Sequence, residues 1–449
     1  MPPRGGRRPT ASPGSRKRYS ARKVLSLSPQ STVANRTSLA QTGETKDYDP
    51  SLLYRPHNFT TARVDHFHNE TLYEPHSDAS FTIRYWVDAS HYAPGGPVFL
   101  FLCGETSCED RLRLLQKGNL AQLAEATHGV AVLFEHRYYG SSHPVANLTT
   151  PNLRFLTTEQ ANADAAHFAR TVGTLPDLPR DADTGPDKTP WIAMGPSYAG
   201  GQAAILRKVY PDVFWGAISS SGVTLAVADY WRYYDAHQTY GSRECIDKTQ
   251  RIVQVVDAVL LDDKLSGGEH AKALKDLFGL AGLEFDSEFG SALMDGIDQW
   301  QSRSWDPRGG SKSFDLRCGN LTADTLLYPG QEAKRRVAES ILEVTGASRD
   351  LATPLLNWGG FIQSRHSCTY NLTETGTCDP LRNETFLAGV ELDSWEWRSW
   401  SYQVCTEYVL SPTPSPRLSP PRSHTLLTTQ LGGATSRPAT TCRSSLCPS

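Results

Sequence analysis

The chain has 449 residues, a formal net charge of −3, 39% hydrophobic residues and 10% aromatic residues. This composition can supply a sizeable globular core, and it gives no support to a bulk nucleic-acid binder, which is usually basic. The length favours a large core domain with an insertion, or two to three domains. No apolar run approaches transmembrane length, so we expect no membrane span.

The N-terminal residues 1–45 are basic and rich in Ser, Thr and Pro, which predicts a disordered segment. They contain no apolar stretch of the kind found in a secretory signal peptide. Seven Asn-x-Thr sequons nevertheless favour a secreted glycoprotein, at Asn35, Asn58, Asn69, Asn147, Asn320, Asn371 and Asn383. We therefore expect an extracellular or vacuolar-lysosomal protein whose start was wrongly assigned. The alternative is a cytosolic protein with chance sequons.

Nine cysteines are present, and none forms a paired Cys-x-x-Cys zinc pattern. In a secreted protein they are expected to form disulfides rather than bind metal. Cys368 and Cys378 could pair across a short polar segment, and Cys245 and Cys318 could pair across a longer one. The sequence leaves the connectivity open.

Strand and helix patterns alternate through the first half of the ordered chain, which we expect to begin near Val64. Strands are predicted at 81–87, 97–102, 129–135, 191–195 and 213–219, and helices at 114–126, 157–172 and 200–210. This alternation predicts a parallel-type central sheet with crossover helices, which is an α/β fold.

The second half has a different character. Strand patterns fade over residues 228–390, where amphipathic stretches such as 252–261 and 332–344 predict a helical cap inserted into the core. The core would then comprise residues 46–227 and a return at 391–408. Residues 409–449 are a low-complexity tail, which we interpret as disordered or not native to the protein.

A strand-to-helix turn carries the chemistry. The segment 195–201 reads Gly-Pro-Ser-Tyr-Ala-Gly-Gly, and its context matches a nucleophile elbow of the Gly-x-Ser-x-Gly type. Ala199 replaces the last glycine of that pattern, and the competing interpretation is an ordinary glycine-rich turn. As an elbow, the segment makes Ser197 the catalytic nucleophile. The backbone N–H groups of Tyr198 and Gly104 would then form the oxyanion hole.

Several blocks resemble one peptidase family: 64–67, 135–142, 153–161, 197–200 and 219–222. The chain is similar over roughly residues 60–408 to the family of lysosomal prolyl carboxypeptidase and dipeptidyl peptidase II, which includes fungal acid prolyl endopeptidases. The resemblance implies an α/β-hydrolase core with a helical cap. It also implies cleavage of proline-containing peptides through an acyl-enzyme on Ser197, without metal or other cofactor, and it raises the option of a homodimer.

Other polar residues in these blocks have a structural interpretation. Glu135, His136 and Arg137 follow a strand and are expected to fix the core through hydrogen bonds and an ion pair. His136 precedes the nucleophile, which contradicts the usual order of the triad in the chain. Asp65 and His66 are interpreted in the same way, and Glu159 and Gln160 as residues capping a helix.

The family's remaining triad segments have no counterpart here. We find neither its Asn-Gly-x-x-Asp-Pro-Trp-like segment nor its Gly-x-His-Cys-like segment, and we assign no triad Asp or His. Asp393, His366 and His424 lie in no convincing triad context. A frameshift or retained intron near residue 409 would explain this. Without a triad Asp and His, we expect the chain as given to be inactive, although its scaffold is that of a serine peptidase. Two alternatives stay open: a non-catalytic secreted glycoprotein that binds peptides or a partner, and an esterase on the same fold.

Overall fold

The computed structural model describes residues 49–225, 234–262, 264–265, 268–304, 310–365, 376–379, 388–392 and 396–408. The predictions for segments 1–45 and 409–449 fall outside this part of the chain. So do several individual residues named above: Asn35, Asn371, Asn383, His366, Cys368, Asp393 and His424. None of the helices in the described ranges is long and apolar enough to cross a membrane.

Six strands form one mixed sheet in the order β1-β2-β4-β3-β5-β6. Their bounds are β1 His57–Arg63, β2 Ser80–Asp88, β3 Val98–Leu102, β4 Val130–Phe134, β5 Trp191–Pro196 and β6 Phe214–Ser220. Strand β2 runs antiparallel to β1 and β4, whereas β3 to β6 are mutually parallel. The five predicted strands are confirmed within one or two residues. Strand β1 was missed, because order was expected to begin only near Val64.

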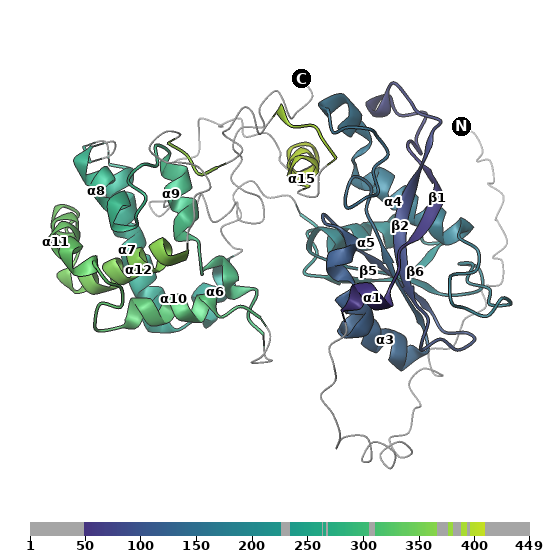
Figure 1. The fold of residues 1–449 in the computed structure, drawn as a ribbon, viewed down its shortest axis with the longest axis horizontal. Helices are drawn as coiled ribbons and strands as arrows, with labels where there is room; N and C mark the ends of the chain where they lie inside the picture. Colours follow the sequence, from purple (N-terminus) through teal and green to yellow (C-terminus); the bar gives the residue numbers. More distant parts are fainter. Residues whose placement is uncertain are drawn as a thin grey trace, which may run out of the picture. The chain divides into compact units, whose positions relative to one another are not determined.

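Helices cover both faces of this sheet (Figure 1). On β3, Val98, Leu100 and Leu102 pack in one apolar cluster with α4 (Thr158–Thr171) and α5 (Ser197–Val209). The alternate residues of β3 pack in a second cluster with α3 (Asn119–Thr127). A strand that is buried on both faces reads as a continuous apolar run, as this one does.

Two helix boundaries differ from the prediction. The helix expected at 114–126 is split into α2 (Arg113–Gln116) and α3, because Gly118 between them has a φ of 122°. Helix α5 begins at Ser197 rather than at Gly200, so the first turn of the helix follows the strand without a linker. The other short elements before β5 are α1 at Pro50–Leu53 and 3-10 turns at Thr71–Tyr73, Cys108–Arg111 and Thr150–Phe155.

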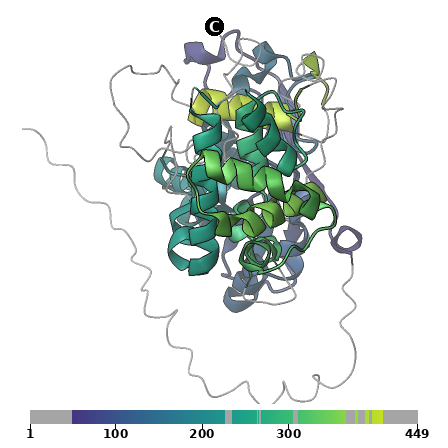
Figure 2. The ribbon, with the colours of Figure 1, turned by 90° about the vertical axis from the view of Figure 1, so that its left-hand side faces the viewer.

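The helices from α6 to α12 lie together (Figures 1 and 2) and have an apolar core of their own, whose buried members lie between Tyr234 and Ile362. Their bounds are α6 Asp235–Tyr240, α7 Arg243–Leu260, α8 Glu269–Leu277, α9 Asp286–Leu293, α10 Ser313–Thr322, α11 Arg335–Val344 and α12 Ala352–Arg365. A disulfide between Cys245 and Cys318 joins α7 to α10, which was one of the two pairings left open.

The final described segment returns to the loops that follow the sheet strands. It comprises α15 (Trp397–Gln403) and the turn Val404–Tyr408. Arg398 donates from Nε to the Leu148 carbonyl, and Ser399 donates from Oγ to the Tyr138 carbonyl over 3.2 Å. These contacts join residues about 250 positions apart, so the segment is tied to the sheet part of the chain by buried polar groups.

Candidate active site

Ser197 lies at the junction of β5 and α5 with a φ of 54°. A positive φ is uncommon for a residue with a side chain, and it is maintained only where the surrounding structure fixes the backbone. This is the strained strand-to-helix turn that the sequence predicted. The turn places the Ser197 side chain at the carboxyl end of a parallel strand and at the N-terminus of a 13-residue helix.

The glycines around Ser197 allow close backbone packing. A Cβ on Gly195 would lie 2.5 Å from the Ala199 carbonyl oxygen, and one on Gly201 would lie 2.1 Å from the Val223 carbonyl oxygen. Gly200 is similarly confined by the Ser220 carbonyl oxygen at 2.9 Å. These three positions exclude any side chain. Ala199, which replaces the last glycine of the pattern, is buried within the apolar cluster on this face of the sheet.

The loops after three adjacent parallel strands meet at Ser197. Strand β3 lies between β4 and β5, and residues Gly104 and Glu135 follow the carboxyl ends of β3 and β4. Gly104 has a φ of 74°, and a Cβ there would lie 3.3 Å from the Ala199 Cβ. The loop after β3 therefore contacts the first turn of α5. A disulfide between Cys103 and Cys108 closes this loop, and sequence reasoning had not paired these cysteines.

The hydroxyl of Tyr198 is the centre of a buried hydrogen-bond network. It lies 2.9 Å from His136 Nε2, 3.2 Å from Thr158 Oγ1 and 3.0 Å from Gln403 Nε2, which donates to it. Gln403 in turn accepts a hydrogen bond from the Tyr139 hydroxyl. The side chain that follows Ser197 is thus held by three separate segments of the chain.

The partners of His136 fix its tautomer. Its Nδ1 lies 2.7 Å from the Arg137 carbonyl oxygen, which can only accept, so Nδ1 carries the proton. Burial lowers the pKa of His136 to about 4, so the ring is neutral above that pH. Nε2 therefore accepts a hydrogen bond from Tyr198. His136 acts on Tyr198 rather than on Ser197, in agreement with its interpretation as a structural residue.

Arg137 and Asp164 form a fully buried ion pair beside this network. Arg137 donates to both carboxylate oxygens of Asp164 over 2.7 Å, and it also donates to the carbonyl oxygens of Arg63, Val64 and Phe155. A bidentate pair with every remaining donor satisfied can offset the cost of removing both charges from water. Arg137 thereby fixes the end of β1 against the loop after β4.

Glu135 occupies a second buried polar site at the end of β4. It accepts hydrogen bonds from the guanidinium of Arg84, the backbone N–H of Cys108 and the hydroxyl of Ser142. Its carboxylate therefore joins β2, the disulfide loop and the turn after β4. Glu135 has the structural role that its position in the sequence indicated.

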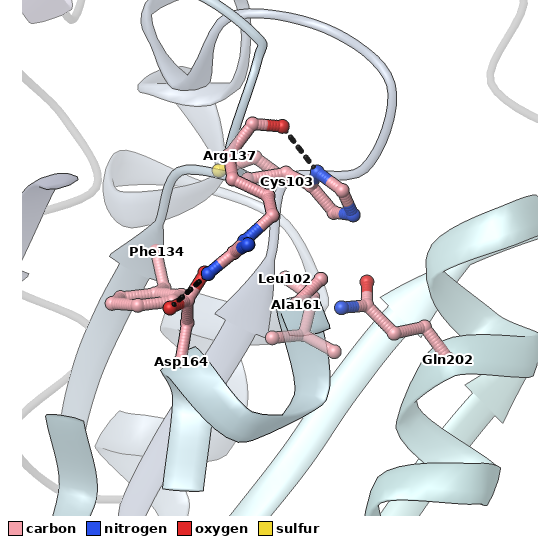
Figure 3. A pocket seen from close by; sticks show the side chains of 8 residues that line it. Leu102, Cys103, Phe134, Arg137, Ala161, Asp164 and Gln202 are labelled. Atoms are coloured by element: carbon pink, nitrogen blue, oxygen red, sulfur yellow. Dashed lines mark hydrogen bonds and ion pairs between the residues drawn. The ribbon is translucent and has the colours of Figure 1, made fainter. Parts of the chain in front are cut away.

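A small cavity lies beside His136 and the Arg137–Asp164 ion pair. Its volume is about 10 Å³, roughly the space of one water molecule. Figure 3 shows Gln202 pointing from α5 toward the side chains of Leu102, Arg137 and Asp164. The Oε1 atom of Gln202 is buried and has no hydrogen-bond partner within the described ranges. The cavity is too small for a peptide, so we do not regard it as the substrate site.

Three carboxyl groups near the same loops have raised pKa values. Burial raises the pKa of Glu105, which follows Gly104, and the pKa of Glu407, which accepts two hydrogen bonds from Thr158. Burial also raises the pKa of Glu396 to about 7, with Asp110 and Glu135 adding repulsion. Such shifts are frequent at functional sites, although structural networks also cause them. No sequence pattern indicated this group, because its members come from separate parts of the chain.

No triad partner is visible for Ser197. Within the described part of the chain, its hydroxyl makes no hydrogen bond to a His, Asp or Glu side chain.

The capping of α4 differs from the expectation that Glu159 and Gln160 cap this helix. The Thr157 side chain is the cap, because its Oγ1 accepts a hydrogen bond from the Gln160 backbone N–H over 3.2 Å. Glu159 instead accepts a hydrogen bond from the Tyr73 hydroxyl, and the Gln160 side chain binds Asp65.

The described sequons differ in exposure. Asn58 and Asn69 are exposed and Asn147 is half-buried, so a glycan could leave the first two without repacking. Asn320 is only 9% exposed, and its Nδ2 donates to the Leu316 carbonyl over 2.8 Å within α10. A glycan is attached through that nitrogen. The structure therefore argues against the prediction of a glycan at Asn320.

The strand order, the crossover helices on both faces and the elbow at Ser197 define an α/β-hydrolase core with a helical insertion. Residues 62–282 match the sequence profile of the family described as Serine carboxypeptidase S28. Over these residues the chain is similar to the S28 serine peptidases, as the resemblance of its sequence blocks implied.

Individual relatives agree with this family. The chain is 43% identical over 350 residues to a "Probable extracellular serine carboxypeptidase" of Arthroderma benhamiae, covering 77% of this chain and 48% of that protein. It is 35% identical over 225 residues to "Serine protease vicPa" of Bipolaris victoriae, covering 49% and 41%. It is 29% identical over 349 residues to "Thymus-specific serine protease" of Homo sapiens, covering 73% and 60%. The chain spans about half the length of the first of these relatives.

Proposed function

We propose that this chain is the Ser197-bearing part of a serine peptidase that acts on proline-containing peptides. The observation that carries the proposal is the φ of 54° at Ser197, between a parallel strand and a helix. Only a tightly confined backbone maintains that conformation, and the three glycines around it supply the confinement. The preference for proline rests on the resemblance of the sequence blocks alone.

In this reaction the Ser197 hydroxyl attacks the scissile carbonyl carbon and forms a tetrahedral intermediate. The backbone N–H groups of Tyr198 and Gly104 stabilise the oxyanion, since both flank the nucleophile at the carboxyl end of the sheet. The amine leaves, and water then hydrolyses the acyl-enzyme. The general base that takes the Ser197 proton is not among its described hydrogen-bond partners.

The helices of the insertion, which we predict to span residues 228–390, would act as a cap on the core and select peptides by access. Two disulfide-linked helices, α7 and α10, give this part an internal core that does not depend on the sheet. Exopeptidase action, of the dipeptidyl-peptidase or carboxypeptidase kind, is part of the proposal and rests on the resemblance of the sequence blocks alone. An extracellular location and glycans at Asn58 and Asn69 belong to the same proposal, and a homodimer remains a prediction.

The test is labelling of the purified chain with a serine-reactive phosphonate, followed by assays on prolyl peptides and a p-nitrophenyl ester panel. Wild type should be labelled, Ser197→Ala should not be, and Ser141→Ala, an exposed serine after β4, should behave like wild type. Labelling with cleavage of prolyl peptides supports the proposal, and labelling with ester cleavage alone favours an esterase. An unlabelled wild type that is folded argues for a non-catalytic glycoprotein, which the lack of a described base for Ser197 would explain.

A further inference from the structure

The loop between β1 and β2 holds a compact group of side chains that the proposed reaction does not use. Val64 N donates to the Ala79 carbonyl over 3.0 Å and closes the loop at its base. Inside it, Asp65, His68 and His76 each offer one potential ligand atom, and these atoms all lie within 4.8 Å of one another. Within the described residues this is the group whose composition suits a metal ion.

Asp65 is oriented for this role by the core of the protein. Its side chain is buried, and its Oδ1 accepts hydrogen bonds from the Phe67 backbone N–H and from Gln160 Nε2, both over 2.8 Å. Gln160 is itself fixed, because its Oε1 accepts from the His66 backbone N–H over 2.9 Å. Secondary hydrogen bonds of this kind hold a ligating carboxylate in position. The other oxygen, Oδ2, faces His76 Nδ1 at 2.8 Å.

The two histidines lie on the solvent side of Asp65. Their rings are nearly parallel, at 20°, with centroids 5.3 Å apart. The His76 side chain is 25% exposed and that of His68 is 46% exposed, so an ion can reach the group from solvent. Asp78 Oδ1 lies 3.8 Å from His68 Nε2 and provides a fourth donor at the rim.

We propose that Asp65, His68 and His76 bind a divalent transition-metal ion of the zinc type, with Asp78 or water as the fourth ligand. Two imidazole nitrogens and a carboxylate oxygen are borderline ligands that suit Zn²⁺, whereas Ca²⁺ and Mg²⁺ require oxygen ligands. Ligand atoms of a tetrahedral zinc site lie about 3.4 Å apart, as follows from metal–ligand distances of about 2.0–2.1 Å. The potential ligand atoms here lie within 4.8 Å of one another. Rotation of the exposed His68 side chain can bring its ring nitrogen closer to the other two ligand atoms.

The ion would join two distant points of one surface loop and connect them, through Asp65 and Gln160, to the start of α4. Its role is structural, because a ligand that binds only the folded chain stabilises it by mass action. The sequence offered no zinc pattern, since the ligands are spaced irregularly and Asp65 reads as a core residue. The site is independent of Ser197 and of the proposed peptidase reaction.

The test uses the full chain after chelation and dialysis, titrated with Zn²⁺ and, in a second series, with Co²⁺. Wild type should bind one Zn²⁺ per chain, raise its melting temperature on binding, and give the visible absorption of four-coordinate Co²⁺. His68→Gln, which changes an exposed side chain, should weaken Zn²⁺ binding by about tenfold or more and abolish the Co²⁺ absorption. His91→Gln, a matched change at an exposed histidine after β2, should leave both unchanged.

His76→Asn provides a second ligand variant in case His68→Gln does not fold. Equal melting temperatures of the metal-free wild type and variants show that folding is intact. The proposal is overturned if wild type shows no saturable binding of one Zn²⁺. It is equally overturned if both ligand variants bind Zn²⁺ as tightly as His91→Gln does.

Discussion

Gln403 donates a hydrogen bond from Nε2 to the Tyr198 hydroxyl over 3.0 Å, although the two residues lie 205 positions apart in the chain. Gln403 is fully buried, and its Oε1 accepts from Tyr139 in the loop after β4. Tyr198, which follows Ser197, is therefore fixed by the last described segment of the chain. The return of residues 391–408 to the core was expected from sequence, but this contact was not.

Tyr198→Phe should destabilise the protein by about 1–3 kcal/mol, because it leaves His136 Nε2 and Gln403 Nε2 buried without their partner. The midpoint of urea denaturation measures this loss. Tyr54→Phe is the matched control, since the Tyr54 hydroxyl donates to the half-buried Asp88 at the end of β2, over 3.1 Å, and has no part in the network around Tyr198. Equal midpoints for the two variants would show that the network around Tyr198 adds nothing to stability.

Gly201→Ala should destabilise the elbow by about 1–3 kcal/mol, because the new Cβ would lie 2.1 Å from the Val223 carbonyl oxygen. Gly216→Ala is the control, since a Cβ there meets nothing within 4 Å on β6. We expect the control to be neutral or slightly stabilising. Thermal melting of both variants provides the comparison, and a neutral Gly201→Ala would contradict the close packing of α5 described here.

Arg137→Met should cost about 3–5 kcal/mol, because it leaves the buried Asp164 carboxylate without its cation. The double variant Arg137→Met, Asp164→Leu should recover part of this loss. Arg170→Met tests the exposed pair with Asp212, whose side chains are 43% and 67% exposed, and should change stability by less than about 1 kcal/mol. Denaturation midpoints at neutral pH distinguish the two pairs; similar losses would mean that burial does not matter here.

Glu396 should make stability depend on pH in a specific direction. Burial raises its pKa in the folded protein to about 7, above the ordinary value of 4.5. The folded state thus holds the proton more tightly than the unfolded state does. The contribution of Glu396 is fully present below about pH 4.5 and is lost as the pH rises through about 7.

Glu396→Gln separates this group from the others that titrate. The glutamine stays neutral, and its Oε1 can still accept the hydrogen bond that the Gly140 N–H donates over 2.7 Å. The melting temperature of the variant relative to wild type should therefore rise between pH 4.5 and 7 and level off above that range. Glu391→Gln, at a carboxyl group in an exposed turn, is the control. A flat difference across this range would show that Glu396 titrates normally.

Local sequence patterns were sufficient to predict many of the strands and helices and the turn at Ser197. The apolar run of β3, the small residues around Ser197 and the amphipathic spacing of α7 and α11 each depend on neighbours within one or two turns, so they could be recognised in sequence. The apolar strand before Ser197 and the helical pattern after it also located the turn at Ser197. The one strand missed, β1, has an irregular register with β2 between Phe59 and Ala62, and its pattern is correspondingly weak.

By itself the sequence determined the alternation of strands and helices, the elbow at Ser197 and the helical character of the insertion. Only the tertiary structure decided that β2 runs antiparallel and that Cys103 pairs with Cys108. It also brought Gln403 to Tyr198 and assembled Asp65 with His68 and His76. The physical reason is the range of the interactions. The periodic burial of a helix or strand can be recognised from residues that are neighbours in the sequence, whereas a polar contact between distant segments depends on the path of the whole chain.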